Sequence, residues 1–218
     1  MKVVILAGGF GTRLSEETDI RPKPLVEIGG KPILWHVMKI YAAHGLKDFI
    51  ICCGYKGSSI KSYFANYLLE SSNVVFDFKA NSTSYLSSAD IDWKVTLVDT
   101  GLETMTGGRL LRVADFIDGD TFCLTYGDGV SDVDITKLLA FHKAHGKTAT
   151  VTAVPSPGRF GILDIAGNQV VSRCQAKPEN EIGWVHGRCC GLNRTRGCVS
   201  RGARAVCGRA ALVAVVGW

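Results

Sequence analysis

The sequence predicts an α/β fold built on a mostly parallel, mixed sheet with helices on both of its faces. Short apolar runs alternate along the chain with segments whose apolar residues have helical spacing. Runs that are apolar throughout are typical of strands covered on both sides, as in parallel sheets. At 218 residues the chain can bury a full core, and one domain is the default expectation.

The strands expected in the parallel part of the sheet are short and rich in aliphatic and aromatic residues. They are predicted at Met1–Leu6, Phe49–Cys53, Val74–Phe78, Lys94–Val98 and Thr121–Tyr126. Cys52 and Cys53 lie inside such a run and are expected to be core residues. Shorter strands, expected to pair antiparallel, follow at Thr148–Val154, Gly161–Ile165 and Gln169–Cys174.

Helices are predicted between these strands from apolar spacing and from their end signals. The segment Ile33–Tyr41 follows a proline suited to a first turn, and Gly45 marks its stop. Ser58 is the expected N-cap of a helix that reaches about Leu69. Two further helices are predicted at Arg109–Ile117 and at Val133–His145, the latter closed by Gly146.

Charge and leader signals exclude several classes of protein. The net charge of +5 arises in the C-terminal segment, since residues 1–183 carry 19 basic and 20 acidic residues, so a patterned nucleic-acid face is not expected. The start of the chain lacks a charged segment followed by a long apolar stretch, and no apolar run is long enough to span a membrane. We therefore expect a cytoplasmic protein whose eight cysteines are reduced.

A glycine loop follows the first strand, and a lysine between two prolines follows the loop. Leu6-Ala7-Gly8-Gly9-Phe10-Gly11-Thr12-Arg13 places three glycines where backbone N–H groups can face anionic oxygens, and Lys23 lies ten residues beyond Arg13. The order favours a triphosphate site, although a glycine-rich turn after a first strand is common in α/β proteins. A dinucleotide fingerprint would need glycine at Leu14, and a Walker loop would need a Gly-Lys-Ser/Thr ending, which is missing here.

Asp128 lies in a Gly-Asp-Gly sequence directly after the strand predicted at Thr121–Tyr126. Open α/β sheets bind ligands at the carboxyl edge of their strands, so this carboxylate and the glycine loop can meet at one site. Mg²⁺ prefers hard oxygen ligands and takes one or two carboxylates with phosphate oxygens. A turn capped by aspartate is the competing interpretation. Asp132 and Asp134 are expected to start the following helix.

These segments together resemble the sugar-1-phosphate nucleotidylyltransferases, and most closely their cytidylyltransferase branch. The resemblance covers roughly residues 1–183 and rests on Leu6–Arg13, Lys23-Pro24, Glu27–Ile33, Cys52–Gly57, Val98–Gly101, Thr104–Arg109 and Tyr126–Val130. It implies a Rossmann-like fold of the nucleotide-diphospho-sugar transferase type. It also implies transfer of a cytidylyl group from CTP to glucose 1-phosphate, with Mg²⁺ as cofactor, giving CDP-glucose and pyrophosphate in a homo-oligomeric enzyme.

The resemblance also assigns roles to individual residues. Arg13, Lys23 and Asp128 would be catalytic, with Asp128 also the metal ligand and Arg13 stabilising the departing pyrophosphate. Thr104 and Arg109 would contact the cytosine nucleotide, whereas the sequence alone would make Arg109 an exposed residue at a helix start. Lys177 would bind the sugar phosphate, although Ala176 stands where the family has glutamate. Substrate-binding residues would be Leu6, Ala7, Gly8, Gly9, Phe10, Gly11, Thr12, Arg13, Lys23, Thr104, Arg109, Asp128 and Lys177.

The composition changes abruptly after Trp184, where Gly, Arg, Ala, Val and Cys dominate and periodicity is lost. The resembled family continues with a further strand, a helical lobe and a second metal-binding aspartate. We therefore predict a catalytic domain over residues 1–183, incomplete at its C-terminal end, and an atypical tail over 184–218 from a frameshifted or disrupted end. The rival functions are transfer with another base or sugar, a non-catalytic nucleotide-sugar binding module and, more distantly, a dehydrogenase.

Overall fold

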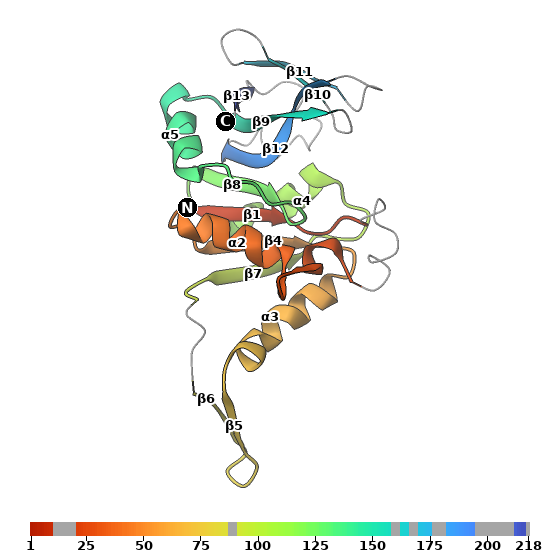
Figure 1. Cartoon of the computed structure of the whole chain (residues 1–218), viewed down its shortest axis with the longest axis vertical. Helices are drawn as coiled ribbons and strands as arrows, with labels where there is room; N and C mark the ends of the chain where they lie inside the picture. The colour runs from red at the N-terminus through yellow and green to blue at the C-terminus, as the bar shows by residue number, and fades with distance from the viewer. Residues whose placement is uncertain are drawn as a thin grey trace.

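The computed structural model describes residues 1–10, 21–86, 91–157, 162–165, 170–175, 182–194 and 212–216. A mixed sheet forms the centre of the molecule, and helices lie along its sides (Figure 1). The predicted class, an α/β fold on a mostly parallel mixed sheet, is confirmed. Among the described helices, none is long and apolar enough to cross a membrane.

Four parallel strands make one half of the sheet, in the order β8-β1-β4-β7. The apolar side chains of β1, β4 and β8 are buried on both faces and those of β7 are half-buried, which explains the continuous apolar runs in the sequence. The four strands confirm predictions to within one residue: β1 (Lys2–Leu6), β4 (Asp48–Cys53), β7 (Lys94–Asp99) and β8 (Thr121–Tyr126).

The other half of the sheet is largely antiparallel, as predicted. The long strand β12 (Ile182–Asn193) pairs antiparallel with β8, with β10 (Ile162–Ile165) and with β9 (Ala149–Pro157). Beyond these, β11 (Val171–Gln175) pairs antiparallel with β10, and β13 (Leu212–Val216) pairs parallel with β9.

Helices cover both faces of the parallel strands. On one face, α4 (Thr106–Arg112) and the short 3-10 turn η2 (Ala114–Phe116) lie over a core that contains Leu110, Val113 and Ile117. On the other face, α2 (Ile33–Ala43), α3 (Gly57–Ser71) and α5 (Ile135–His145) bury apolar side chains such as Leu34, Val37, Ile60, Ile135 and Leu138.

The helix ends follow the predicted signals with two corrections. Asp134 accepts a hydrogen bond from the Lys137 backbone N–H at 3.0 Å and caps α5, as expected. Ser58 was expected to cap α3 but lies in its first turn, because the Gly57 N–H bonds to the Gly54 carbonyl and starts the helix earlier. The helix predicted at Arg109–Ile117 begins at Thr106 and breaks at Val113 into η2.

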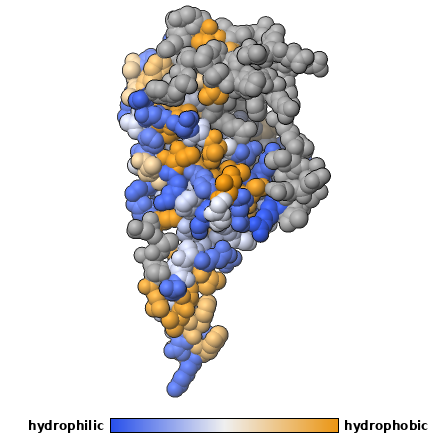
Figure 2. Space-filling view, viewed as in Figure 1, coloured by the Kyte–Doolittle hydropathy of each residue, from blue (hydrophilic) through white to orange (hydrophobic). Residues whose placement is uncertain are grey.

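A two-stranded hairpin extends beyond α3 as an arm, away from the main sheet (Figure 1). The strand predicted at Val74–Phe78 is found, but its expected place in the parallel sheet is wrong: it forms β5 (Val74–Asp77), which pairs antiparallel with the unpredicted β6 (Ser82–Tyr85) in a separate hairpin. Hydrophobic residues gather on this arm, and Phe78 is 92% exposed (Figure 2). A second small hairpin, β2 (Glu27–Ile28) with β3 (Lys31–Pro32), connects η1 (Lys23–Leu25) to α2.

Residues 184–193 and 212–216 lie in β12 and β13, although the sequence after Trp184 lacks helix or strand periodicity. A strand needs backbone partners rather than a side-chain pattern, and β12 fills the free edge of β8. Of its described side chains, Cys189, Cys190 and Leu192 are buried and Asn193 is half-buried. The division of the chain at residue 183 stays a prediction.

Candidate active site

The loops after β1 and β8 leave the sheet side by side at the same edge. Leu6 and Tyr126, the last residues of these two strands, are paired in register, and the Gly127 N–H bonds to the Leu6 carbonyl at 2.9 Å. On the other side of β1, the Ala7 N–H bonds to the Cys52 carbonyl at 3.1 Å. The glycine loop and Asp128 therefore begin at the carboxyl edge of neighbouring parallel strands, where open α/β sheets bind ligands.

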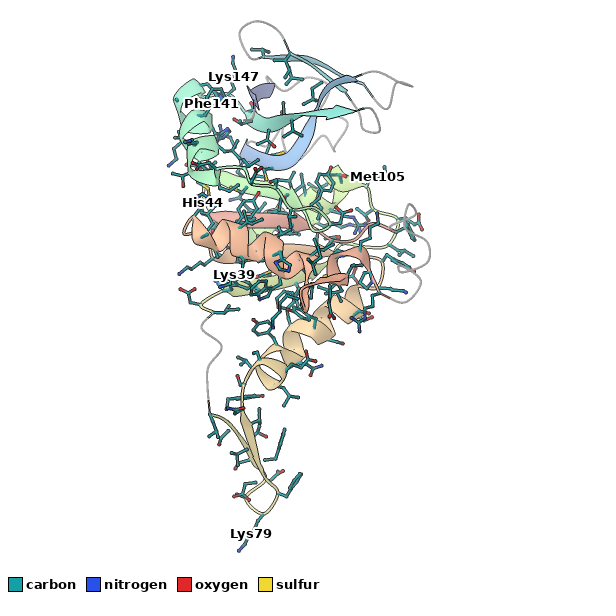
Figure 3. All side chains as sticks on the ribbon, viewed as in Figure 1. Lys39, His44, Lys79, Met105, Phe141 and Lys147 are labelled. Atoms are coloured by element: carbon teal, nitrogen blue, oxygen red, sulfur yellow. The ribbon has the colours of Figure 1, made fainter. Side chains whose placement is uncertain are left out.

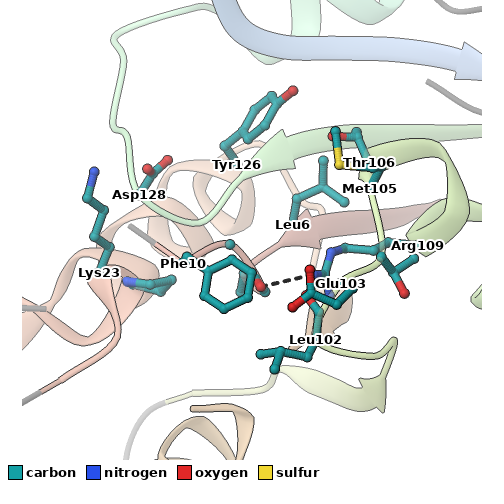
Figure 4. A pocket seen from close by; sticks show the side chains of 15 residues that line it. Leu6, Phe10, Lys23, Leu102, Glu103, Met105, Thr106, Arg109, Tyr126 and Asp128 are labelled. Atoms are coloured by element: carbon teal, nitrogen blue, oxygen red, sulfur yellow. Dashed lines mark hydrogen bonds between the residues drawn. The ribbon is translucent and has the colours of Figure 1, made fainter. Parts of the chain in front are cut away.

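A cavity of about 280 Å³ opens at this edge (Figure 4). It gathers the described residues that the sequence analysis proposed for substrate binding: Leu6, Ala7, Gly8, Gly9, Phe10, Lys23, Thr104, Arg109 and Asp128. Gly11, Thr12, Arg13 and Lys177 lie outside the described residues, so their assigned roles stay predictions.

The cavity also contains residues that the sequence analysis did not propose. Tyr126 directly precedes the Gly127-Asp128 turn, and its place at a strand end was a usable signal. The others flank a predicted residue in the chain and could have been found from it: Pro24, Leu102, Glu103, Met105 and Thr106.

Lys23 and Asp128 lie on the same side of the cavity (Figure 4). Lys23 begins η1, whose neighbouring Pro24 and Leu25 are buried, and the Leu25 N–H bonds to the Pro22 carbonyl at 2.8 Å. Because the two prolines restrict the backbone and the turn is anchored in the core, the lysine stem leaves from a fixed point. A fixed lysine can bind a polyanion directly, and a neighbouring carboxylate can hold a metal ion that is bound to the same polyanion.

Arg109 is buried at the back of the cavity, which corrects the sequence-only expectation of an exposed arginine. Its side chain has 5% of its surface exposed. One terminal nitrogen donates to the Cys53 carbonyl at 3.1 Å and to Thr100 Oγ1 at 2.7 Å, and the other donates to the Gly8 carbonyl at 2.9 Å and to Leu102 at 3.1 Å. These bonds use the four N–H groups of the two terminal nitrogens, so the Nε–H is the guanidinium donor without a partner among the described residues.

Two glycines make room for this guanidinium. A Cβ atom at Gly8 would lie 2.6 Å from Arg109 Cζ, and one at Gly54 would lie 2.7 Å from the Gly8 carbonyl oxygen. Burial lowers the pKa of Arg109, and the nearby cation Arg112 lowers it further, against the opposing effect of Cys52. The arginine is therefore a buried cation that joins the glycine loop to the ends of β4 and β7.

The cysteines beside the site are confirmed as core residues. Cys52 and Cys53 are fully buried, and burial raises the pKa of Cys52 to about 12 and that of Cys53 to about 11. Both thiols are protonated near neutral pH, which argues against a cysteine nucleophile.

Comparison with known proteins identifies the family. The sequence profile described as nucleotidyl transferase matches residues 2–187. The chain belongs to the nucleotidyl transferase family. This nucleotidyl transferase is 60% identical over 188 residues to the glucose-1-phosphate cytidylyltransferase of Salmonella typhimurium, an alignment that covers 86% of the chain and 73% of that relative. The glucose-1-phosphate cytidylyltransferase of Salmonella typhi matches with the same identity and coverage.

Solved structures share the fold of this nucleotidyl transferase. HddC from Yersinia pseudotuberculosis superposes with a TM-score of 0.74 at 22% identity, covering 99% of the chain and 89% of HddC. HddC complexed with GMP-PN superposes with a TM-score of 0.71 at 23% identity, covering 99% of the chain and 90% of HddC. At this level of identity the comparison establishes the fold alone.

Proposed function

We propose that this nucleotidyl transferase moves a cytidylyl group from CTP to glucose 1-phosphate. A phosphate oxygen of the sugar attacks the α-phosphorus of CTP, the bond from that phosphorus to the bridging oxygen breaks, and pyrophosphate leaves with CDP-glucose as the second product. The observation that carries the proposal is the 60% identity to enzymes named for this reaction. The cavity supports it, because a glycine loop, a lysine and a carboxylate line one space.

The proposed roles follow from charge and position. Two polyanions must approach each other, so positioning and neutralisation of charge supply most of the catalysis. Backbone N–H groups of Gly8, Gly9 and Gly11, with Thr12 and Arg13, would hold the nucleotide phosphates, and Lys23 would bridge the reacting phosphates. Lys177 would bind the sugar phosphate. Thr104 and Arg109 would contact the cytosine nucleotide, with Arg109 limited to its Nε–H by the bonds described above.

Mg²⁺ is part of this proposal, and Asp128 would hold it. In the described part of the chain, no group of three or more His, Cys, Asp or Glu side chains could bind a metal by itself. One carboxylate on the cavity wall nevertheless fits Mg²⁺, which keeps several waters and takes its other ligands from substrate phosphates. When bound, the ion neutralises phosphate charge.

Substrate profiling tests the proposal. Purified protein would be assayed for pyrophosphate release with CTP, UTP, dTTP, ATP and GTP, each with glucose 1-phosphate and mannose 1-phosphate, and products would be resolved by chromatography. We expect CDP-glucose from CTP and glucose 1-phosphate at the highest kcat/KM. Preference for another pair would change the assigned base or sugar. Thermal protection by CTP without any product would establish the rival interpretation, a binding module.

We also propose a homo-oligomer in the cytoplasm, as the sequence resemblance implies. The hairpin arm supports the oligomer, because Phe76 and Phe78 are exposed and an isolated two-stranded hairpin is marginally stable in water. Light scattering coupled to gel filtration would measure the assembly. Serine at both phenylalanines should reduce its mass if the arm mediates contact between copies.

A further inference from the structure

The loop from Thr100 to Met105 forms one wall of the candidate active site, since Leu102–Met105 line the cavity. Two arginines one helical turn apart on α4 reach back to this loop. Arg109 bonds to Thr100 Oγ1 and to the Leu102 carbonyl, as described above. Arg112 Nη1 donates to the Thr100 carbonyl and, at 2.6 Å, to Thr104 Oγ1.

The loop backbone is shaped around the Arg112 guanidinium. Gly101 has a φ of +81°, a conformation that residues with a side chain rarely adopt, and its N–H bonds to Asp99 Oδ1 at 2.9 Å. A Cβ atom at Gly101 would overlap Arg112 Nη1 and lie 2.9 Å from Thr104 Oγ1. Gly101, Thr104 and Arg112 therefore form one packed unit, of which Thr104 lines the cavity and Arg112 does not.

The bond from Arg112 biases the hydrogen bonding of the Thr104 hydroxyl. A hydroxyl has one proton to donate and two lone pairs that accept. The cationic N–H occupies a lone pair, so the hydroxyl proton points away from Arg112 and is the group offered to a ligand. A second N–H donor would approach an oxygen that already accepts from a cation and is therefore disfavoured. An acceptor on the ligand would be attracted to the hydroxyl proton of Thr104.

We propose that Arg112 is a positioning residue that favours cytosine through Thr104. The inference deepens the proposed function and rests on it, because it takes Thr104 as a contact of the base. Cytosine presents two neighbouring acceptors, O2 and N3, whereas uracil and thymine carry a proton on N3. A threonine hydroxyl that donates toward N3 matches cytosine, where N3 accepts, and opposes uracil and thymine, where N3 carries a proton. Arg112 itself does not line the cavity, so its effect passes through the loop.

The test compares nucleotide discrimination in Arg112→Met, Thr104→Val and the double variant, with Mg²⁺ and glucose 1-phosphate. We expect Arg112→Met to lower the ratio of kcat/KM for CTP to that for UTP by about tenfold, mainly through a higher KM for CTP. Thr104→Val should lower the ratio similarly, and the double variant should show no further loss, since both changes remove one interaction. Arg112→Lys, which keeps the cation, should retain part of the preference.

Leu111→Ala is the matched control, because Leu111 neighbours Arg112 on α4, is 53% exposed and does not line the cavity. It should leave the ratio unchanged. Arg112 is also exposed, so the midpoint of thermal unfolding without nucleotide should stay within a few degrees of the wild type. CTP protection in the same melts gives a second readout, which should fall in Arg112→Met.

The outcomes separate the inference from the proposed function. A wild-type preference for CTP that Arg112→Met retains overturns the inference alone. If the losses in the ratio of kcat/KM for CTP to that for UTP add in the double variant, Arg112 does not act through Thr104 and the inference is overturned. A wild-type protein that favours no cytosine nucleotide overturns the proposed function and the inference with it.

Discussion

Arg109 donates a hydrogen bond to the carbonyl oxygen of Gly8 at 2.9 Å and thereby joins α4 to the loop after β1. The two residues are 101 positions apart in the sequence. The same guanidinium also bonds to Cys53 at the end of β4 and to Thr100 just after β7. One buried cation thus connects the carboxyl ends of three neighbouring strands, where the candidate active site lies.

We predict that Gly54→Ala destabilises the protein by about 3 kcal/mol and lowers its activity. The added methyl group would overlap the Arg109 guanidinium and lie 2.7 Å from the Gly8 carbonyl oxygen, so Arg109 would lose buried hydrogen bonds. Chemical denaturation measures the change. Gly9→Ala is the control for stability, because a Cβ there would have no atom within 4 Å. Equal stability of the two variants would contradict the packing argument.

We predict that Lys23→Met lowers kcat/KM by about two to three orders of magnitude without changing the unfolding midpoint. Lys23 lines the cavity beside Asp128, and its removal would leave phosphate charge without this fixed cation. Steady-state kinetics and thermal melts measure the two effects. The matched control is Lys79→Met, since Lys79 lies at the tip of the hairpin arm, far from the cavity (Figure 3). Comparable activity in both variants would remove Lys23 from the proposed chemistry.

We predict that Asp128→Asn raises the Mg²⁺ concentration needed for half-maximal CTP binding by about tenfold or more. The amide keeps the shape of the side chain but lacks the charge that attracts a hard cation. Calorimetric titration of CTP at several Mg²⁺ concentrations measures the shift independently of turnover. Asp132→Asn is the control, because Asp132 follows in the same loop but does not line the cavity. An unchanged Mg²⁺ dependence would favour the turn interpretation of Asp128.

The parallel half of the fold was predictable because strands covered on both faces have continuous apolar runs in the sequence. The strand predicted at Thr121–Tyr126 has the bounds of β8, and those of β1, β4 and β7 each differ by one residue. The C-terminal strand β12 was missed, because its position depends on the free backbone edge of β8 rather than on its own pattern. Likewise, β6 is polar and exposed and gains its structure from pairing with β5.

The candidate site was predictable where residues directly follow strands. Gly8 and Asp128 come just after β1 and β8, so parallel pairing alone brings them to one edge. The burial of Arg109 was not predictable, since its carbonyl partners Gly8 and Cys53 are 101 and 56 positions away. No local sequence spacing predicts such long-range contacts. The bond from Arg112 to Thr104 was not predictable either, because Arg112 lies in α4 whereas Thr104 lies in the loop before it.

Two histidines of α5, His142 and His145, contact the same threonine of β9, Thr150. Asn193 Nδ2 donates to the Lys147 carbonyl, so Asn193 Oδ1 accepts from His142 Nε2 at 2.9 Å. Thr150 Oγ1 is hydrogen-bonded to His142 Nδ1 at 2.8 Å and to His145 Nε2 at 2.7 Å. His145 Nδ1 accepts from the Lys147 N–H at 2.9 Å, so the His145 imidazole is neutral and its Nε2 donates to Thr150 Oγ1.

We predict that this network makes the protein less stable as the pH falls below about 6.5, the ordinary pKa of histidine. Burial lowers the pKa of His145 in the folded chain, and the neighbouring His142 and Lys147 lower it further. Between the folded and the unfolded pKa the unfolded chain binds more protons, so the free energy of unfolding decreases through that window as acid is added. Urea denaturation from pH 5 to 8 measures it. His145→Gln should remove this part of the slope, whereas His36→Gln, on α2, should leave it. Identical slopes in all three proteins would show that His145 titrates alike in both states.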